Sequence, residues 1–139
     1  MVILVVDTVS LVRSNLDRLL TANGHEVLTA DTGKAAVEIL KNDQRISLVV
    51  TDLHVAGMTA VDLFKATRNI ERVGDGGNSS PPEFILFTSL RPDGGMNNTD
   101  VQLLHETAAL GFIDVLFKPL VRGQLLQHVG TVKGGPTPK

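Results

Sequence analysis

The sequence contains no cysteine, no tryptophan and no tyrosine, and only five of its 139 residues are phenylalanine. The lack of cysteine excludes disulfide bridges, thiolate zinc sites and cysteine nucleophiles, and it is compatible with the cytoplasm, where we place the protein. The lack of tryptophan and tyrosine, which could stack on a flavin, disfavours a flavin site. A net charge of -2 gives no electrostatic reason to expect binding to nucleic acid or to an anionic membrane.

Long hydrophobic runs are also missing. The first apolar run, residues 1–6, lacks a basic leader and ends at Asp7, so it predicts neither a signal peptide nor a membrane span. A hydrophobic content of 42% with 20% charged residues is ordinary for a globular protein. The length predicts one domain with a real core, which we place at residues 1–132, followed by a flexible tail or the start of a linker at 133–139.

Short apolar segments alternate with segments of helical periodicity along the chain. Strands are expected at about 2–6, 25–30, 48–51, 84–87 and 112–117, and helices at about 9–22, 34–41, 59–70, 99–110 and 120–132. Polar loops are expected at 72–82 and 90–98, and a flexible polar segment is expected to follow Asp52 and to end in Gly57. The alternation predicts an α/β fold, a doubly wound five-stranded parallel sheet with strand order 2-1-3-4-5.

Polar side chains follow four of the expected strands. Asp7 and Asp52 would project from adjacent strand ends, and two carboxylates that lie close together favour a shared cation. Oxygen ligands suit Mg²⁺, to which His54 would add only its backbone carbonyl. Asp52 is also a candidate nucleophile, Thr88 a hydrogen-bond donor to a phosphoryl oxygen, and Lys118 a compensating positive charge. The set predicts phosphoryl-transfer chemistry.

Nearly the whole chain resembles the receiver domain of two-component response regulators, which has a flavodoxin-like fold. The resemblance rests on ILVVD ending at Asp7, LVVTD ending at Asp52, Gly57-Met58, Thr88 and Lys118-Pro119. It implies a signalling domain rather than an enzyme. Asp52 would take a phosphoryl group from a sensor histidine kinase or a phosphotransfer protein, with Mg²⁺. Thr88 would then move toward the phosphoryl group and Lys118 would pair with it, which would switch an interaction face toward an unidentified target or output domain.

The sequence departs from the family pattern at several positions. Thr8 stands where a second acidic residue is usual, which should weaken Mg²⁺ binding, because affinity depends on ligand charge. Val115 replaces the usual aromatic switch residue, and Ala56 replaces a proline. These departures support an alternative, a pseudo-receiver that binds partners without phosphorylation. A flavodoxin-like enzyme is a third possibility, disfavoured because no phosphate-binding loop follows Asp7.

Overall fold

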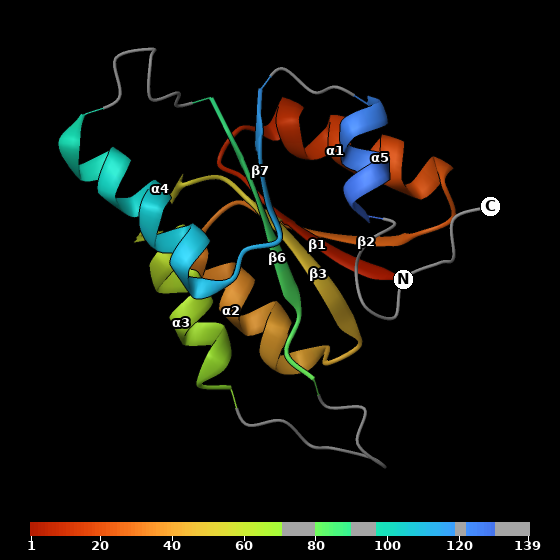
Figure 1. Ribbon diagram of the computed structural model, residues 1–139. Helices are drawn as coiled ribbons and strands as arrows, with labels where there is room; N and C mark the ends of the chain where they lie inside the picture. The colour runs from red at the N-terminus through yellow and green to blue at the C-terminus, as the bar shows by residue number, and fades with distance from the viewer. Residues whose placement is uncertain (71–79, 90–96, 119–121, 130–139) are drawn as a thin grey trace.

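The structure is a computed structural model that describes residues 1–70, 80–89, 97–118 and 122–129. It forms one main sheet with helices on both sides (Figure 1). The elements are, in chain order, β1 Val2–Val6, α1 Ser10–Ala22, β2 Glu26–Ala30, α2 Gly33–Asn42, β3 Ile46–Thr51, β4 His54–Val55, β5 Met58–Thr59, α3 Ala60–Arg68, β6 Glu83–Thr88, α4 Asn98–Leu110, β7 Asp114–Phe117 and α5 Arg122–Val129.

The main sheet contains five strands, all parallel, in the order β2-β1-β3-β6-β7. Because β6 and β7 are its fourth and fifth strands along the chain, this confirms the predicted order 2-1-3-4-5. Val6 pairs with Ala30 on one side and with Thr51 on the other. Thr88 pairs with Phe117. The carboxyl ends of the strands therefore lie along one edge of the sheet.

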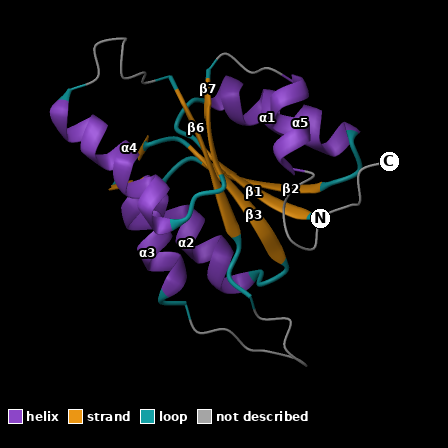
Figure 2. Cartoon of the chain, in the orientation of Figure 1, coloured by secondary structure: helices purple, strands orange, loops and turns teal. Residues whose placement is uncertain are grey.

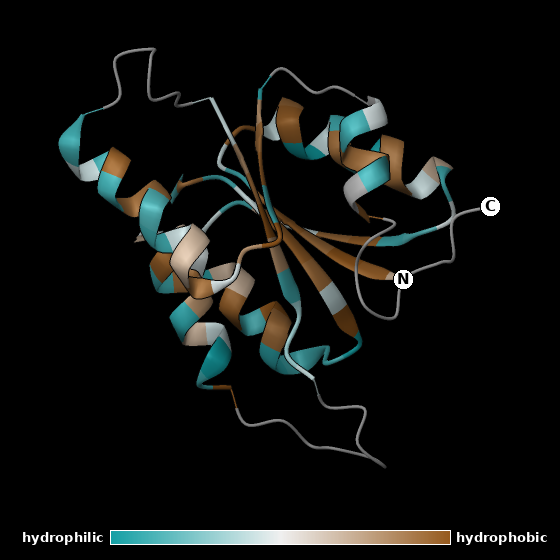
Figure 3. Ribbon diagram, viewed as in Figure 1, coloured by the Kyte–Doolittle hydropathy of each residue, from teal (hydrophilic) through white to brown (hydrophobic). Residues whose placement is uncertain are grey.

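The core is divided into two parts by the sheet, because side chains alternate between its faces along every strand. Leu4 and Val6 point to the side covered by α2, α3 and α4, whereas Ile3 and Val5 point to the side of α1 and α5. Figure 2 shows these two helical layers, and Figure 3 shows that the central strands are largely hydrophobic. Because the strands are buried on both faces, their sequences are continuous apolar runs.

The segment after Asp52 is ordered, so the prediction of a flexible polar stretch was wrong. β4 and β5 form a two-stranded antiparallel hairpin, in which Val55 pairs with Met58. Gly57, in its turn, has φ of 90°, a left-handed conformation that glycine adopts without strain. Leu53 and Val55 are buried in the core on the α2–α4 side. Alternate apolar side chains therefore anchor a segment that appears polar in the sequence.

Most predicted elements are present, with boundaries that differ by a few residues. The third strand begins at Ile46, and α2 runs from Gly33, where the Thr32 side chain accepts the N–H of Ala35 and caps the helix. The predicted last helix, 120–132, corresponds to α5, and the predicted end residues 120 and 132 lie outside the described residues. Most of the two predicted loops and the proposed tail also lie outside them.

Candidate functional site

Three charged side chains converge at the carboxyl edge of the sheet. The ammonium of Lys118, which follows β7, lies 2.8 Å from Oδ2 of Asp7 and 3.0 Å from Oδ2 of Asp52. Asp7 follows β1 and Asp52 follows β3, so the three come from positions 111 and 66 residues apart. The structure thus brings together the two carboxylates and the lysine that the sequence predicts at the strand ends.

The group is held in a partly dry environment. The side chains of Lys118, Asp7 and Asp52 are 16%, 2% and 18% exposed. Burial opposes the charge on Lys118, but the hydrogen bonds and charges of the two carboxylates outweigh burial, so the pKa of Lys118 lies above its ordinary value. The lysine is therefore protonated at neutral pH, and one positive charge lies between two negative ones.

Asp7 is fixed by the start of α1. The first residue before that helix, Val9, has no side chain that can cap it, and its N–H donates to Oδ1 of Asp7 at 2.9 Å. Nη1 of Arg13, one turn into the helix, donates to the backbone carbonyl of Asp7 at 2.7 Å. These contacts hold Asp7 from both its side chain and its backbone. Arg13 also adds a second positive group beside the site.

Asp52 is fixed by its own loop. The N–H of Leu53 donates to Oδ1 of Asp52 at 2.7 Å, which leaves Oδ2 for Lys118. Leu53 is fully buried, and its carbonyl accepts the N–H of Ala60 at the start of α3 at 2.8 Å. The carboxylate therefore faces the partly solvated edge while the next residue is anchored in the core.

Thr88 is the last residue of β6, and His54 is the first residue of β4, two residues after Asp52. Thr88 is fully buried at the end of β6, and its carbonyl accepts the backbone N–H of Lys118 at 2.9 Å. The exposed side chain of His54 agrees with the prediction, but it has a partner that the sequence did not indicate. Its Nε2 lies 2.6 Å from Oδ1 of Asp100 in the first turn of α4.

A small apolar recess, also not predicted, lies beside Lys118. It encloses about 180 Å³ between the first turns of α1 and the end of β6, and its lining includes Leu11 and Phe87. Val9 and Leu11, at 49% and 67% exposed, are the large hydrophobic side chains that stand out on the described surface. Leu11 lies five residues before the buried Leu16, about 140° away around the helix, so it falls outside the buried stripe of Leu16, Leu19 and Leu20.

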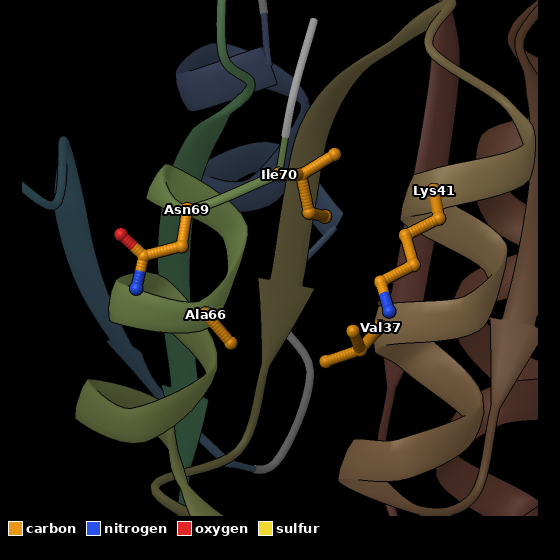
Figure 4. Close-up of a pocket in the computed structure, with 5 residues that line it drawn as sticks. All are labelled: Val37, Lys41, Ala66, Asn69 and Ile70. Atoms are coloured by element: carbon orange, nitrogen blue, oxygen red, sulfur yellow. The ribbon is translucent and has the colours of Figure 1, made fainter.

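A larger cavity lies away from the strand-end site. It has a volume of about 530 Å³ and lies between α2 and α3, where Val37, Ala66 and Ile70 form its apolar lining and Lys41 and Asn69 its polar one (Figure 4). Both helices end here, at the amino-terminal edge of the sheet. The cavity shares no residue with the group around Asp52, and the chemistry of the site does not involve it.

The donor set at the strand ends fits a weakly held hard cation. Oδ2 of Asp7 and Oδ2 of Asp52 both lie within 3.0 Å of one positively charged atom, so the two oxygens converge on a single point. The position of a third acid is taken by Thr8, whose side chain is neutral and exposed. Within the described parts of the chain, no three His, Cys, Asp or Glu side chains gather around a possible ion. The carboxylate count is therefore two.

Comparison with known proteins identifies the family of the chain. The family described as "Response regulator receiver domain" matches residues 3–130. The chain therefore belongs to the receiver domain family of two-component signal transduction, whose members are signalling domains that usually bind Mg²⁺ at their phosphorylation site.

Two relatives illustrate the range of proteins that carry such a domain. Sensor histidine kinase AruS of Pseudomonas aeruginosa is 30% identical over 130 residues, which are 94% of this chain and 12% of that protein. Two-component response regulator ORR3 of Oryza sativa subsp. japonica is 35% identical over 66 residues, 48% of this chain and 50% of that protein. The chain thus spans about an eighth of the first relative, and its match covers half of the second.

Solved structures give the same fold. A response regulator receiver protein from Pseudomonas putida is 26% identical with a TM-score of 0.74, over 93% of this chain and 94% of that one. Chemotaxis protein CheY4 of Vibrio cholerae is 22% identical with a TM-score of 0.72, over 95% and 98% of the two chains. None of the helices in the described residues has the length and apolar character needed to cross a membrane.

Proposed function

We propose that this receiver domain accepts a phosphoryl group on Asp52 and thereby switches a protein–protein interaction. The observation that carries the proposal is the convergence of Asp7, Asp52 and Lys118 at one edge of the sheet. A partly exposed carboxylate can act as a nucleophile toward phosphorus and form an acyl phosphate. The protonated lysine beside it can then pair with the negatively charged phosphoryl group.

In the proposed step, an oxygen of Asp52 forms a bond to phosphorus as the N–P bond of a phosphohistidine in the donor breaks. The donor histidine leaves as imidazole and takes up a proton. Lys118 would stay near the transferred group and offset its added negative charge. Thr88 would donate its hydroxyl hydrogen to a phosphoryl oxygen.

The residues that would hold Mg²⁺ are Asp7, Asp52 and the backbone carbonyl of His54. When bound, the ion neutralises charge on the phosphoryl oxygens and the acceptor carboxylate. The protein alone contributes a protonated Lys118 to the same task. The absence of a third carboxylate at Thr8 supports weak rather than tight binding of the ion.

The proposed donor is a sensor histidine kinase or a phosphotransfer protein in the cytoplasm. The apolar recess beside Lys118, with exposed Val9 and Leu11 on its rim, supports docking of a protein next to Asp52. Exposed apolar side chains at the entrance to a charged site are better suited to a protein donor than to a small phosphorylated molecule. The downstream target is a protein or an attached output domain that this chain does not identify.

Incubation of the protein with a small-molecule phosphodonor and Mg²⁺ tests the proposal. Intact-mass spectrometry should show the addition of one phosphoryl group, which Asp52→Asn abolishes. Asp31→Asn is the matched control, because Asp31 is an exposed aspartate just after β2, which β1 separates from β3, and the substitution should leave the addition unchanged. Addition that survives Asp52→Asn, or no addition to the unaltered protein, would refute a phosphoacceptor role for Asp52.

A second candidate function is a pseudo-receiver that works without phosphate. Thr8 favours it, because the site has lost one acidic ligand, and so does Val115, which packs partly buried against the α2–α4 core where an aromatic switch residue is usual. Mg²⁺ titration separates the two. Binding in the millimolar range that Asp52→Asn removes favours the phosphorylated switch, and no binding favours the pseudo-receiver.

A further inference from the structure

The pair formed by His54 and Asp100 joins two parts of the fold that are 46 residues apart in sequence. Nε2 of His54, on the hairpin after Asp52, lies 2.6 Å from Oδ1 of Asp100, the third residue of α4. A carboxylate only accepts hydrogen bonds, so Nε2 carries the hydrogen. The Asp100 side chain is 12% exposed, and a carboxylate this buried is costly unless it is paired. The contact therefore fixes the beginning of α4 relative to the hairpin.

His54 is in turn tied closely to the carboxylate of Asp52. Leu53, the single residue between them, is fully buried and donates its N–H to Oδ1 of Asp52. Its carbonyl is held by the N–H of Ala60, so the backbone on both sides of Leu53 is fixed. A change in the charge or the acceptor capacity of the Asp52 carboxylate alters the hydrogen bond that positions this backbone. The imidazole of His54 lies one residue further along the chain.

Position 115 of β7 carries a small apolar side chain, Val115, which packs partly buried against the core on the α2–α4 side. Val115 on β7 is too small and too apolar to act as an aromatic side chain that turns between a buried and an exposed position. Asp100 is otherwise held by its own helix cap, since its N–H donates to Oδ1 of Asn97 at 2.8 Å. The cap uses the N–H of Asp100, whereas its carboxylate binds His54 of the hairpin. Leu103 and Leu104 pack the body of the helix against the core, and the contact with His54 links its first turn to the hairpin.

We propose that the hydrogen bond between His54 and Asp100 transmits the chemical state of Asp52 to the first turn of α4. The imidazole of His54 is a positioning group in this proposal and does not contact the phosphoryl group; the backbone carbonyl proposed as a Mg²⁺ ligand is unaffected by substitution of the side chain. The inference rests on the proposed function for its physiological trigger, phosphorylation of Asp52. A hydrogen bond that is made in one state and weakened in the other gives the two discrete arrangements that coupling between sites requires.

Hydrogen exchange of the backbone amides in residues 98–110, followed by mass spectrometry on the full chain at one pH, tests the proposal. Phosphorylation with a small-molecule phosphodonor and Mg²⁺ should speed exchange in the first turn of α4 by about fivefold, the factor set by one hydrogen bond of ordinary net strength. In His54→Ala the exchange should already be fast, and phosphorylation should add little to it. Intact mass reports how much protein is phosphorylated in each sample.

Two variants control the measurement. His54→Gln keeps an N–H donor near the position of Nε2 and should respond like the unaltered protein. His105→Ala removes an exposed histidine from the same helix α4 and should also respond normally. A full response in His54→Ala, or an unchanged α4 in fully phosphorylated protein, would overturn the proposal while leaving the phosphoacceptor function intact.

The coupling is also tested without phosphorylation. Asp52→Asn changes the charge at the same carboxylate, so it should alter exchange in α4 in the unaltered background and not in the His54→Ala background. If no phosphoryl group is added to the protein but this difference is present, the proposed function fails and the coupling stands. If Asp52→Asn affects α4 equally in both backgrounds, or in neither, the coupling is wrong.

Discussion

The ammonium of Lys118 lies 2.8 Å from Oδ2 of Asp7, which connects the end of β7 with the end of β1 across two intervening strands. The backbone N–H of Lys118 donates to the carbonyl of Thr88, which holds the residue at the carboxyl edge of the sheet, and its long side chain spans the distance to Asp7. Asp52, on one of the intervening strands, receives the second hydrogen bond of the same ammonium. One ammonium thus reduces the repulsion between two carboxylates.

Removal of this lysine should destabilise the fold. Lys118→Met keeps most of the side-chain volume but removes the ammonium that pairs with both carboxylates, and breaking a buried ion pair on one side costs about 3 kcal/mol. Urea denaturation at pH 7 should show this loss as a lower midpoint. Lys65→Met, at an exposed position of α3, should change the free energy of unfolding by less than about 0.5 kcal/mol.

A second substitution should restore part of the stability lost in Lys118→Met. Adding Asp52→Asn to Lys118→Met removes one of the two carboxylate charges, so the double variant should be more stable than Lys118→Met alone. Equal stability of Lys118→Met and the unaltered protein would show that the ion pairs at the strand ends contribute nothing to folding.

A second prediction concerns the missing acid. Thr8→Asp adds a third carboxylate next to Asp7 and should raise the affinity for Mg²⁺ by about tenfold, a gain of roughly 1.4 kcal/mol in binding free energy. Thr8→Asn is the matched control, because it has nearly the shape of aspartate without the charge. Mg²⁺ titration followed by NMR chemical shifts of the amides around Asp52 measures all three proteins. The same affinity in Thr8→Asp and Thr8→Asn would mean that position 8 does not limit ion binding.

The fold and the acidic group were accessible from sequence for a clear physical reason. Strands buried on both faces are continuous apolar runs, and parallel strands place their carboxyl ends along one edge, so Asp7 and Asp52 are aligned once the strands are recognised. Lys118 follows by the same argument. The roles of these residues, of Thr88 and of the His54 carbonyl in phosphoryl transfer and metal binding remain predictions.

The rest depends on contacts that no local pattern contains. The hydrogen bond from His54 to Asp100 joins residues from a hairpin and a distant helix, and neither residue is unusual in its own segment. The hairpin itself was missed because each of its strands has only two residues, too few for a period to be visible. The exposure of Leu11 is consistent with helical spacing, which puts it about 140° from Leu16, but the recess that it borders is formed by separate elements of the fold and has no local signal.

Leu11 gives a third prediction, which concerns the phosphoryl donor. Leu11→Gln removes an exposed apolar side chain from the rim of the recess beside Lys118 and should slow transfer from a phosphorylated histidine-containing protein by about tenfold, the loss expected for one well-packed apolar contact at an interface. Transfer from a small-molecule phosphodonor should be unchanged, because that donor needs no docking surface. Ala22→Gln, at the exposed far end of α1, is the control for the substitution itself. Equal slowing with both donors would place Leu11 in the chemistry or the fold rather than in docking.

The hairpin that follows Asp52 depends on a glycine of α2, which gives the last prediction. The N–H of Gly33 donates to the carbonyl of Ala56 at 3.0 Å, and a Cβ atom at position 33 would overlap the side chain of Met58. Gly33→Ala should therefore lower the free energy of unfolding by about 1–3 kcal/mol, the usual cost of overpacking.

A double-mutant cycle identifies the cause of this loss. Met58→Ala makes room for the new methyl group, so Gly33→Ala should cost less in the Met58→Ala background than in the unaltered protein. Gly123→Ala, in α5 with nothing within 4 Å of the added Cβ, is the control and should be slightly stabilising, because alanine has the higher helix propensity. Urea denaturation measures each variant. If the cost of Gly33→Ala is the same with and without the Met58 side chain, the two residues do not compete for space, and the packing of the hairpin against α2 has another basis.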